Sequence, residues 1–203
     1  MLELVKVRKS YAGQMVVAEA SLRLAAGEAL CITGPSGAGK STLLEIMAGL
    51  IRPDGGLVRR AAPASLLFQD DALIPWLTAA ENLAYILPRR LDEAEKTARI
   101  RRWLERFGLD GHIYPPAMSG GMRRRLGLAR LFASARPLLL LDEPFAFLDQ
   151  AWQEVAAREM AVAVTAGAAL VLTSHDLDPL QLPCFSSTPC RIARAGETPL
   201  RLA

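Results

Sequence analysis

The chain has 203 residues, a formal net charge of +3 and a mean hydropathy of +0.20. This length is enough for one large domain with a substantial core, and the net charge is too small to predict nucleic-acid binding. No apolar run reaches the roughly 18 residues that a membrane span requires, so we expect a cytoplasmic protein whose surplus apolar surface meets a partner.

The N-terminal third of the chain is predicted to contain mainly strands. Residues 2–11 and 15–27 alternate in the manner of antiparallel strands, a pattern that also argues against a signal peptide. Residues 28–33 form a continuous apolar run, typical of a buried strand, and residues 41–50 have the composition of a helix. We therefore expect a strand–loop–helix unit here, preceded by an antiparallel subdomain.

The loop between this strand and helix is rich in glycine and ends in Lys40 and Ser41. Its spacing matches G-x-x-x-x-G-K-[ST], in which backbone N–H groups at a helix N-terminus hold phosphates and the hydroxyl reaches Mg²⁺. A plain glycine turn is the alternative, but the flanking strand and helix favour the phosphate site. We predict that the β,γ-phosphates of a nucleoside triphosphate contact Gly34, Pro35, Ser36, Gly37, Ala38, Gly39, Lys40, Ser41 and Thr42.

Residues 70–116 are expected to be helical and irregular. Residues 92–109 have a clear apolar face, which predicts an amphipathic helix with four residues on that face: Ile100, Trp103, Leu104 and Phe107. Two arginine clusters, residues 101–102 and 123–125, fall on predicted helices. We interpret both clusters as solvated helix faces.

The C-terminal half alternates apolar strands with helices. Strands are predicted at residues 137–144 and 168–175, and helices at residues 123–134 and 150–167. Continuous apolar strands separated by helices indicate a parallel sheet covered on both faces. The whole chain is thus predicted to be one α/β domain, residues 1–203, with an inserted helical subdomain at about residues 70–125.

The strand "LLLL" ends in Asp142 and Glu143. Ligands of open α/β sheets bind at the carboxyl ends of the strands, so these acids are expected beside the phosphates. Asp142 is predicted to hold Mg²⁺, and Glu143 to polarise an attacking water as a general base. Two acids that merely precede a proline turn are the alternative.

Another predicted helix begins with Ser119, Gly120 and Gly121. As in the first loop, glycines at a helix N-terminus leave backbone N–H groups available to an anion. These residues predict a second anion site, unless they are simply a capped helix start with no ligand.

Together, the glycine-rich loop, "SGG" before an arginine-rich helix and "LDEP" resemble the ATP-binding cassette (ABC) family, from about Leu2 to Asp178. The resemblance implies a P-loop NTPase fold with ATP and Mg²⁺ as ligands. It also implies a dimer of this chain, or one with a related cassette, in which the "SGG" motif of one protomer closes over the ATP of the other.

The resemblance assigns four further roles. Tyr11 stacks on adenine, and Gln69 reaches Mg²⁺ and the nucleophilic water. Asp149 lies in a dimer-facing loop, and His175 contacts the γ-phosphate.

A finer resemblance covers residues 68–83, "FQDDALIPWLTAAENL", and points to ATPases of nitrate, sulfonate and taurine-type importers. It implies integral membrane permease subunits contacted through residues 69–83, and a peripheral position on the cytoplasmic face of the inner membrane. Trp76 is expected to expose apolar surface to that partner, although a place in the core is the alternative. A cytochrome-c haem-type exporter ATPase and a small P-loop metabolite kinase are the other candidate functions.

The chain departs from the family at several points. Met122 stands where glutamine is usual, and Met118 where leucine is usual. The segment from Lys40 to Gln69 is shorter than expected, and residues 176–194 carry prolines where the family has a different pattern. These departures put the turnover rate and the fit to partners in question.

Overall fold

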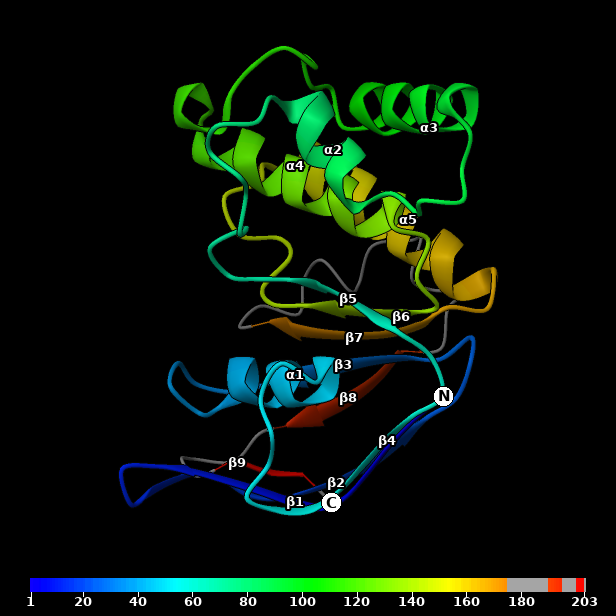
Figure 1. Ribbon diagram of the computed structural model, residues 1–203. Helices are drawn as coiled ribbons and strands as arrows, with labels where there is room; N and C mark the ends of the chain where they lie inside the picture. Colours follow the sequence, from blue (N-terminus) through cyan, green and yellow to red (C-terminus); the bar gives the residue numbers. More distant parts are fainter. Residues whose placement is uncertain (175–189, 195–199, 203) are drawn as a thin grey trace.

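Two β-sheets and a group of helices make up the molecule, for which a computed structural model describes residues 1–174, 190–194 and 200–202 (Figure 1). The smaller sheet has the strand order β4-β1-β2-β9. Its strands are β1 (Leu2–Tyr11), β2 (Gln14–Leu24), β4 (Gly55–Arg60) and β9 (Leu200–Leu202). Strand β1 pairs antiparallel with β2, as predicted, and also with β4, whereas the C-terminal β9 adds a parallel pairing to β2.

The larger sheet has the order β5-β6-β7-β3-β8, and its four pairings are all parallel. The strands are β3 (Ala29–Thr33), β5 (Ala64–Leu67), β6 (Leu138–Leu141), β7 (Ala169–Ser174) and β8 (Cys190–Arg194). Every residue of β6 and β7 is buried, because both faces of the sheet are covered. This burial explains the apolar sequence of β6 and the apolar run Ala169–Leu172 of β7.

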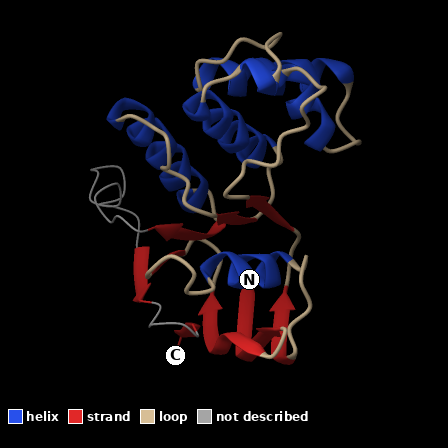
Figure 2. Cartoon of the chain, turned by 90° about the vertical axis from the view of Figure 1, so that its left-hand side faces the viewer, coloured by secondary structure: helices blue, strands red, loops and turns tan. Residues whose placement is uncertain are grey.

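Helix α1 (Lys40–Ala48) lies between the two sheets (Figure 2). It buries its apolar side chains in a core shared by both sheets, and the buried residues are Leu43, Leu44, Ile46 and Met47. The helix thereby fixes the preceding loop against the smaller sheet.

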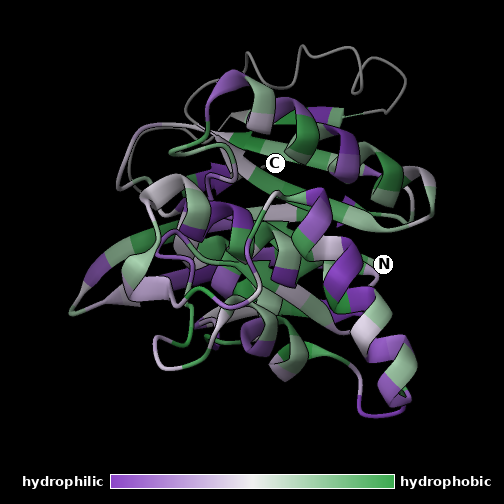
Figure 3. Ribbon diagram, turned by 90° about the horizontal axis from the view of Figure 1, so that it is seen from above, coloured by the Kyte–Doolittle hydropathy of each residue, from purple (hydrophilic) through white to green (hydrophobic). Residues whose placement is uncertain are grey.

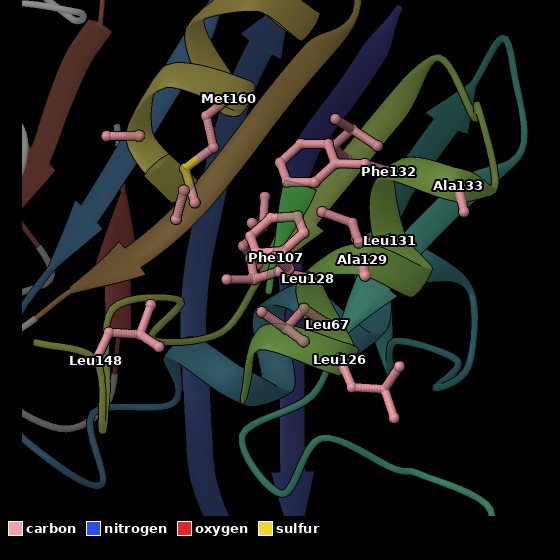
Figure 4. Packing of buried hydrophobic residues seen from close by; sticks show 14 of the residues in the cluster. Leu67, Phe107, Leu126, Leu128, Ala129, Leu131, Phe132, Ala133, Leu148 and Met160 are labelled. Atoms are coloured by element: carbon pink, nitrogen blue, oxygen red, sulfur yellow. The ribbon is translucent and has the colours of Figure 1, made fainter. Parts of the chain in front are cut away.

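The other helices cover the opposite face of the larger sheet (Figure 1). They are α2 (Ala79–Ile86), α3 (Glu93–Arg106), α4 (Gly120–Ala133) and α5 (Gln150–Thr165), with a 3₁₀ turn, η1, at Pro115–Ala117. Seen from above, polar and apolar residues alternate around these helices (Figure 3). Their inner faces form a second core, centred on α4 (Figure 4).

The amphipathic helix predicted at residues 92–109 is confirmed as α3. Leu104 and Phe107 are buried, and Trp103 is half-buried. The rings of Trp103, Phe107 and Phe132 form a stack, with centroids 5.4–6.2 Å apart. This stack joins α3 to α4.

The interpretation of the second arginine cluster as a solvated face is wrong. Arg101 and Arg102 are exposed as expected, and so is Arg123, but Arg124 is fully buried. Arg125 is half-buried and lies over the ring of Trp152, 4.2 Å from its centroid. Helix α4 is enclosed by the sheet and by neighbouring helices, so only part of this run can reach solvent.

Within the part of the chain that the structure describes, no helix has both the length and the apolar content needed to cross a bilayer.

The aromatic stack generates a prediction about stability. Phe107 is fully buried, so Phe107→Ala should lower the free energy of unfolding by about 3–5 kcal/mol. Tyr85→Ala is the control, since Tyr85 is 71% exposed and its loss should change this free energy by less than about 0.5 kcal/mol. Urea denaturation followed by circular dichroism measures both, and equal effects would contradict the packing described here.

Candidate functional site

The glycine-rich loop joins β3 to α1 and is shaped by its neighbour β2. Gly39 has a φ of +94°, and a Cβ atom there would lie 2.8 Å from the carbonyl oxygen of Val16. Only glycine satisfies both conditions. Helix α1 begins without a side-chain cap and without an acidic residue in its first turn. Its N-terminus therefore offers an electropositive end to an external anion.

Lys40 is the cation of this loop, and its side chain is folded back over it. The ammonium donates hydrogen bonds to the carbonyl oxygens of Gly34 and Pro35, both at 2.8 Å. Burial lowers the pKa of Lys40, whereas the carboxylates of Glu143 and Asp142 oppose that shift. The two donated hydrogen bonds and the two nearby carboxylates favour the charged form, so the loop holds a positive charge next to two acids.

The two acids after β6 are fixed by a residue that sequence reasoning missed. Thr173, on β7, donates a hydrogen bond from Oγ1 to Oδ1 of Asp142 at 2.6 Å. The same hydroxyl accepts a bond from the backbone N–H of Glu143 at 3.0 Å. The available signal was a hydroxyl near the end of a mostly apolar strand. Glu143 has a φ of +49°, a strained value for a residue with a side chain.

A cleft of about 420 Å³ brings together Ser41, Gln69 and Asp142, the three residues predicted to hold a metal ion. Their oxygen donors suit a hard cation such as Mg²⁺. Glu45 also lines the cleft, and its pKa is raised by burial and by the negative charge of Asp142. A cation in this cleft would relieve the repulsion between the two carboxylates, so these residues fit the ion.

The predicted second anion site lies at the start of α4. Ser119 is exposed, and its Oγ accepts a hydrogen bond from the N–H of Met122 at 3.2 Å, so the serine is also a helix cap. A Cβ atom on Gly121 would lie 2.8 Å from the carbonyl oxygen of Phe147. Asp149 caps the next helix, accepting from the N–H of Trp152 at 3.0 Å. Neither Ser119, its two glycines nor Asp149 lines the cleft around Ser41.

The structure describes two of the three remaining predicted site residues, which are Tyr11, Gln69 and His175. Tyr11 is exposed at the end of β1, with the ammonium of Lys9 at 5.4 Å from its ring centroid. Gln69 has an exposed side chain, while its backbone carbonyl is held by Arg124 at 2.8 Å. His175 lies outside the described residues.

The segment after Gln69 exposes an aromatic residue as expected. Trp76 is 76% exposed, so the alternative of a core position is wrong. The turn that presents it is organised by Asn82, which is fully buried. The Asn82 amide accepts from the N–H of Ile74 and donates to three carbonyl oxygens, those of Ile74, Leu77 and Thr78, at 2.9–3.0 Å.

Comparison with known proteins identifies a family whose sequences this chain matches. The family described as "ABC transporter" matches residues 17–146. The chain is 46% identical over 150 residues to the taurine import ATP-binding protein TauB of Pseudomonas aeruginosa, an alignment covering 68% of this chain and 57% of that protein. It is 38% identical over 179 residues to the aliphatic sulfonates import ATP-binding protein SsuB 1 of Pseudomonas syringae, covering 84% and 72%.

A third relative is the sulfate/thiosulfate import ATP-binding protein CysA 2 of Chromobacterium violaceum, 46% identical over 144 residues. The alignment covers 64% of this chain and 39% of that protein, so the chain spans only about half the length of several curated relatives that it matches. Among solved structures, a dimeric ATP-binding cassette in a post-hydrolysis state with ADP and Pi is 27% identical, with a TM-score of 0.85 over 96% of this chain and 94% of that one.

The geometry of the loop generates a prediction about nucleotide binding. Lys40→Ala removes the buried ammonium of the loop, and we expect it to abolish ATP binding at ordinary concentrations in isothermal titration calorimetry. Lys96→Ala is the control, because Lys96 pairs with Glu93 on α3 and is not part of the loop. Micromolar affinity retained in Lys40→Ala would refute the phosphate assignment.

Proposed function

We propose, from the premise that this chain belongs to the ABC transporter family, that the chain is the ATP-hydrolysing subunit of a transporter. It couples ATP binding and hydrolysis at a dimer interface to transport through separate membrane subunits. The observation that carries this proposal is the cleft in which Ser41, Gln69 and Asp142 meet beside the loop of Lys40.

The chemistry assigned to the site is phosphoryl transfer to water, which depends mainly on positioning and on charge neutralisation. Lys40 and the loop N–H groups hold the β,γ-phosphates. Ser41, Gln69 and Asp142 would hold Mg²⁺, which would supply further positive charge there. Glu143 accepts a proton from the attacking water, and its backbone is positioned by Thr173.

Tyr11, Gln69 and His175 keep the roles that the family resemblance gives them. Tyr11 stacks on the adenine, while Gln69 and His175 orient the water and the γ-phosphate.

The dimer follows from the separation of the two anion sites. Because Ser119, Gly120 and Gly121 do not line the cleft of their own chain, they are free to close over the ATP of a second cassette. Asp149 lies in the loop that would face that second cassette. Two solved cassettes that this chain resembles are dimeric, which supports a dimer of this chain or one with a related cassette.

The membrane partner is assigned to residues 69–83. The exposed ring of Trp76 gives this segment apolar surface next to Gln69, and a helix of a permease subunit would cover it. The protein would then be peripheral on the cytoplasmic face of the cell membrane. Import of a small solute of the nitrate, sulfonate or taurine type is part of the proposal, and the names of the taurine and aliphatic sulfonates relatives support its sulfonate and taurine members. These names do not favour a haem exporter or a metabolite kinase.

Glu143 provides the test of hydrolysis. Glu143→Gln should retain ATP binding and slow phosphate release by roughly 10²-fold or more, because the amide cannot accept the proton of water. The variant should accumulate as an ATP-bound dimer in size-exclusion chromatography. Glu154→Gln on the exposed side of α5 is the matched control and should hydrolyse ATP normally. Hydrolysis at the parent rate by Glu143→Gln would remove Glu143 from the mechanism.

Ser119 provides the test of the dimer. In the Glu143→Gln background, Ser119→Arg should block ATP-dependent dimerisation, because it places bulk and charge where the second nucleotide docks. Ser119→Ala also loses the helix cap, worth about 1 kcal/mol, but leaves the space open, so it should only weaken the dimer. Analytical ultracentrifugation with ATP distinguishes the two. A Ser119→Arg variant that dimerises like its parent would disprove closure over ATP.

A further inference from the structure

Arg124 is the largest side chain that the structure buries completely. Burying a guanidinium in this way is costly unless charges and hydrogen bonds compensate. Burial lowers the pKa of Arg124, and the carboxylate of Asp71, followed by those of Asp142 and Glu143, opposes the shift. This side chain therefore lies in the field of the acids at the end of β6, although it does not line the cleft.

Among the described residues, the polar partners of Arg124 belong to the loop that carries Gln69. Its Nη1 lies 3.0 Å from Oδ1 of Asp71, a carboxylate that is itself only 9% exposed. The guanidinium also donates to two backbone carbonyls, Nη1 to Phe68 at 2.9 Å and Nη2 to Gln69 at 2.8 Å. Because two of the three partners are main-chain atoms, the guanidinium constrains the path of the loop itself.

The same loop has a backbone that needs such support. Asp71 has a φ of +64° and Ala72 a φ of +44°, values that cost about 1–2 kcal/mol per residue with a side chain. Arg130 donates from Nη1 to the carbonyl oxygen of Ala72 at 2.7 Å. Helix α4 thus holds three carbonyls of this loop with two arginines.

Gly127 lets the loop and α4 approach closely. A Cβ atom at this position would lie 2.7 Å from Cδ1 of Leu67 and 3.4 Å from Oδ1 of Asp71. Figure 4 shows Leu67 beside α4, close to Leu126. A glycine inside a helix costs about 1 kcal/mol relative to alanine, and here it makes room for the last residue of β5 and for Asp71.

We propose that Arg124 and Asp71 form a buried clamp that positions Gln69 for hydrolysis and makes the Gln69 loop move together with α4. This rests on the proposed function, because it concerns the same cleft. Arg124 is a positioning residue: it does not itself line the cleft, and it acts through the backbone of Phe68 and Gln69, which do. Since Ser119 caps α4, the helix that would receive the second nucleotide is the one that holds the Gln69 loop.

The test compares steady-state ATP hydrolysis by the parent with that of Arg124→Gln and Asp71→Asn. We expect kcat to fall roughly 10-fold while KM for ATP changes less than about 2-fold, because the phosphate-binding loop is untouched. The double variant should be no slower than the slower single variant, because both changes remove one clamp. Circular dichroism establishes that each variant is folded.

Glu159→Gln is the matched control. Glu159 is a carboxylate exposed by only 4%, paired with Arg106 at 2.5 Å between α5 and α3, away from the cleft. It undergoes the same chemical change at similar burial, so it should lose stability and keep the parental kcat. An equal loss of kcat in Glu159→Gln would show that the effect is general destabilisation and would overturn the clamp.

Two further outcomes would also overturn the proposal. One is a parental kcat in Arg124→Gln, and the other is a rise in KM that accounts for the whole loss. Should Arg124→Gln fail to fold, Arg124→Lys carries the test: it keeps the charge but cannot reach both carbonyls, so kcat should fall several-fold at constant KM. If the parent protein hydrolyses ATP and the Arg124 and Asp71 variants do so equally well, only the clamp is refuted. If the parent protein has no ATPase activity, the proposed function is refuted.

Discussion

The site depends on the parallel register of the larger sheet. Leu67, Leu141 and Leu172 are paired at one level across β5, β6 and β7, and Cys31 of β3 pairs with Leu172. Parallel strands that are in register must end at the same edge. Main-chain pairing alone therefore brings together Gln69, the acids after Leu141, Thr173 and the glycine-rich loop. This holds before any side chain of the site makes a contact.

Much of this arrangement could be predicted because its signals are local. The conformation of Gly39 and the chemistry of Lys40 and Ser41 are determined within one short segment. An apolar strand that ends in two acids likewise predicts, from its own sequence, that those acids lie at the edge of a sheet. The antiparallel subdomain followed from alternation within single strands. The parallel pairing of β9 with β2 did not, because nothing near Leu200 indicates a partner so far away in the sequence.

The burial of Arg124 could not be predicted from the sequence. A run of three arginines on a helix normally indicates solvent, and only a contact with a distant loop reverses that interpretation. The reversal depends on the left-handed backbone of Asp71, on two carbonyl groups and on the missing side chain of Gly127. Thr173 was missed for the same reason: its hydroxyl matters because β6 is its neighbour, which only the sheet order reveals.

Of the seven described non-glycine residues with a positive φ, four line the cleft or lie within two residues of its lining residues in the sequence: Asp71, Ala72, Glu143 and Phe147. Contacts with neighbouring elements support the segments that contain them. Asp71 is paired with Arg124, the N–H of Glu143 is bonded to Thr173, and Phe147, with a φ of +63°, lies against Gly121. A residue persists in the left-handed region only where surrounding contacts compensate for the strain. The loops of the site are thus ordered by contacts with α4 and β7 rather than by their own propensities. A change in the position of α4 would act first on these loops, so this one helix would connect the two proposed anion sites of the chain.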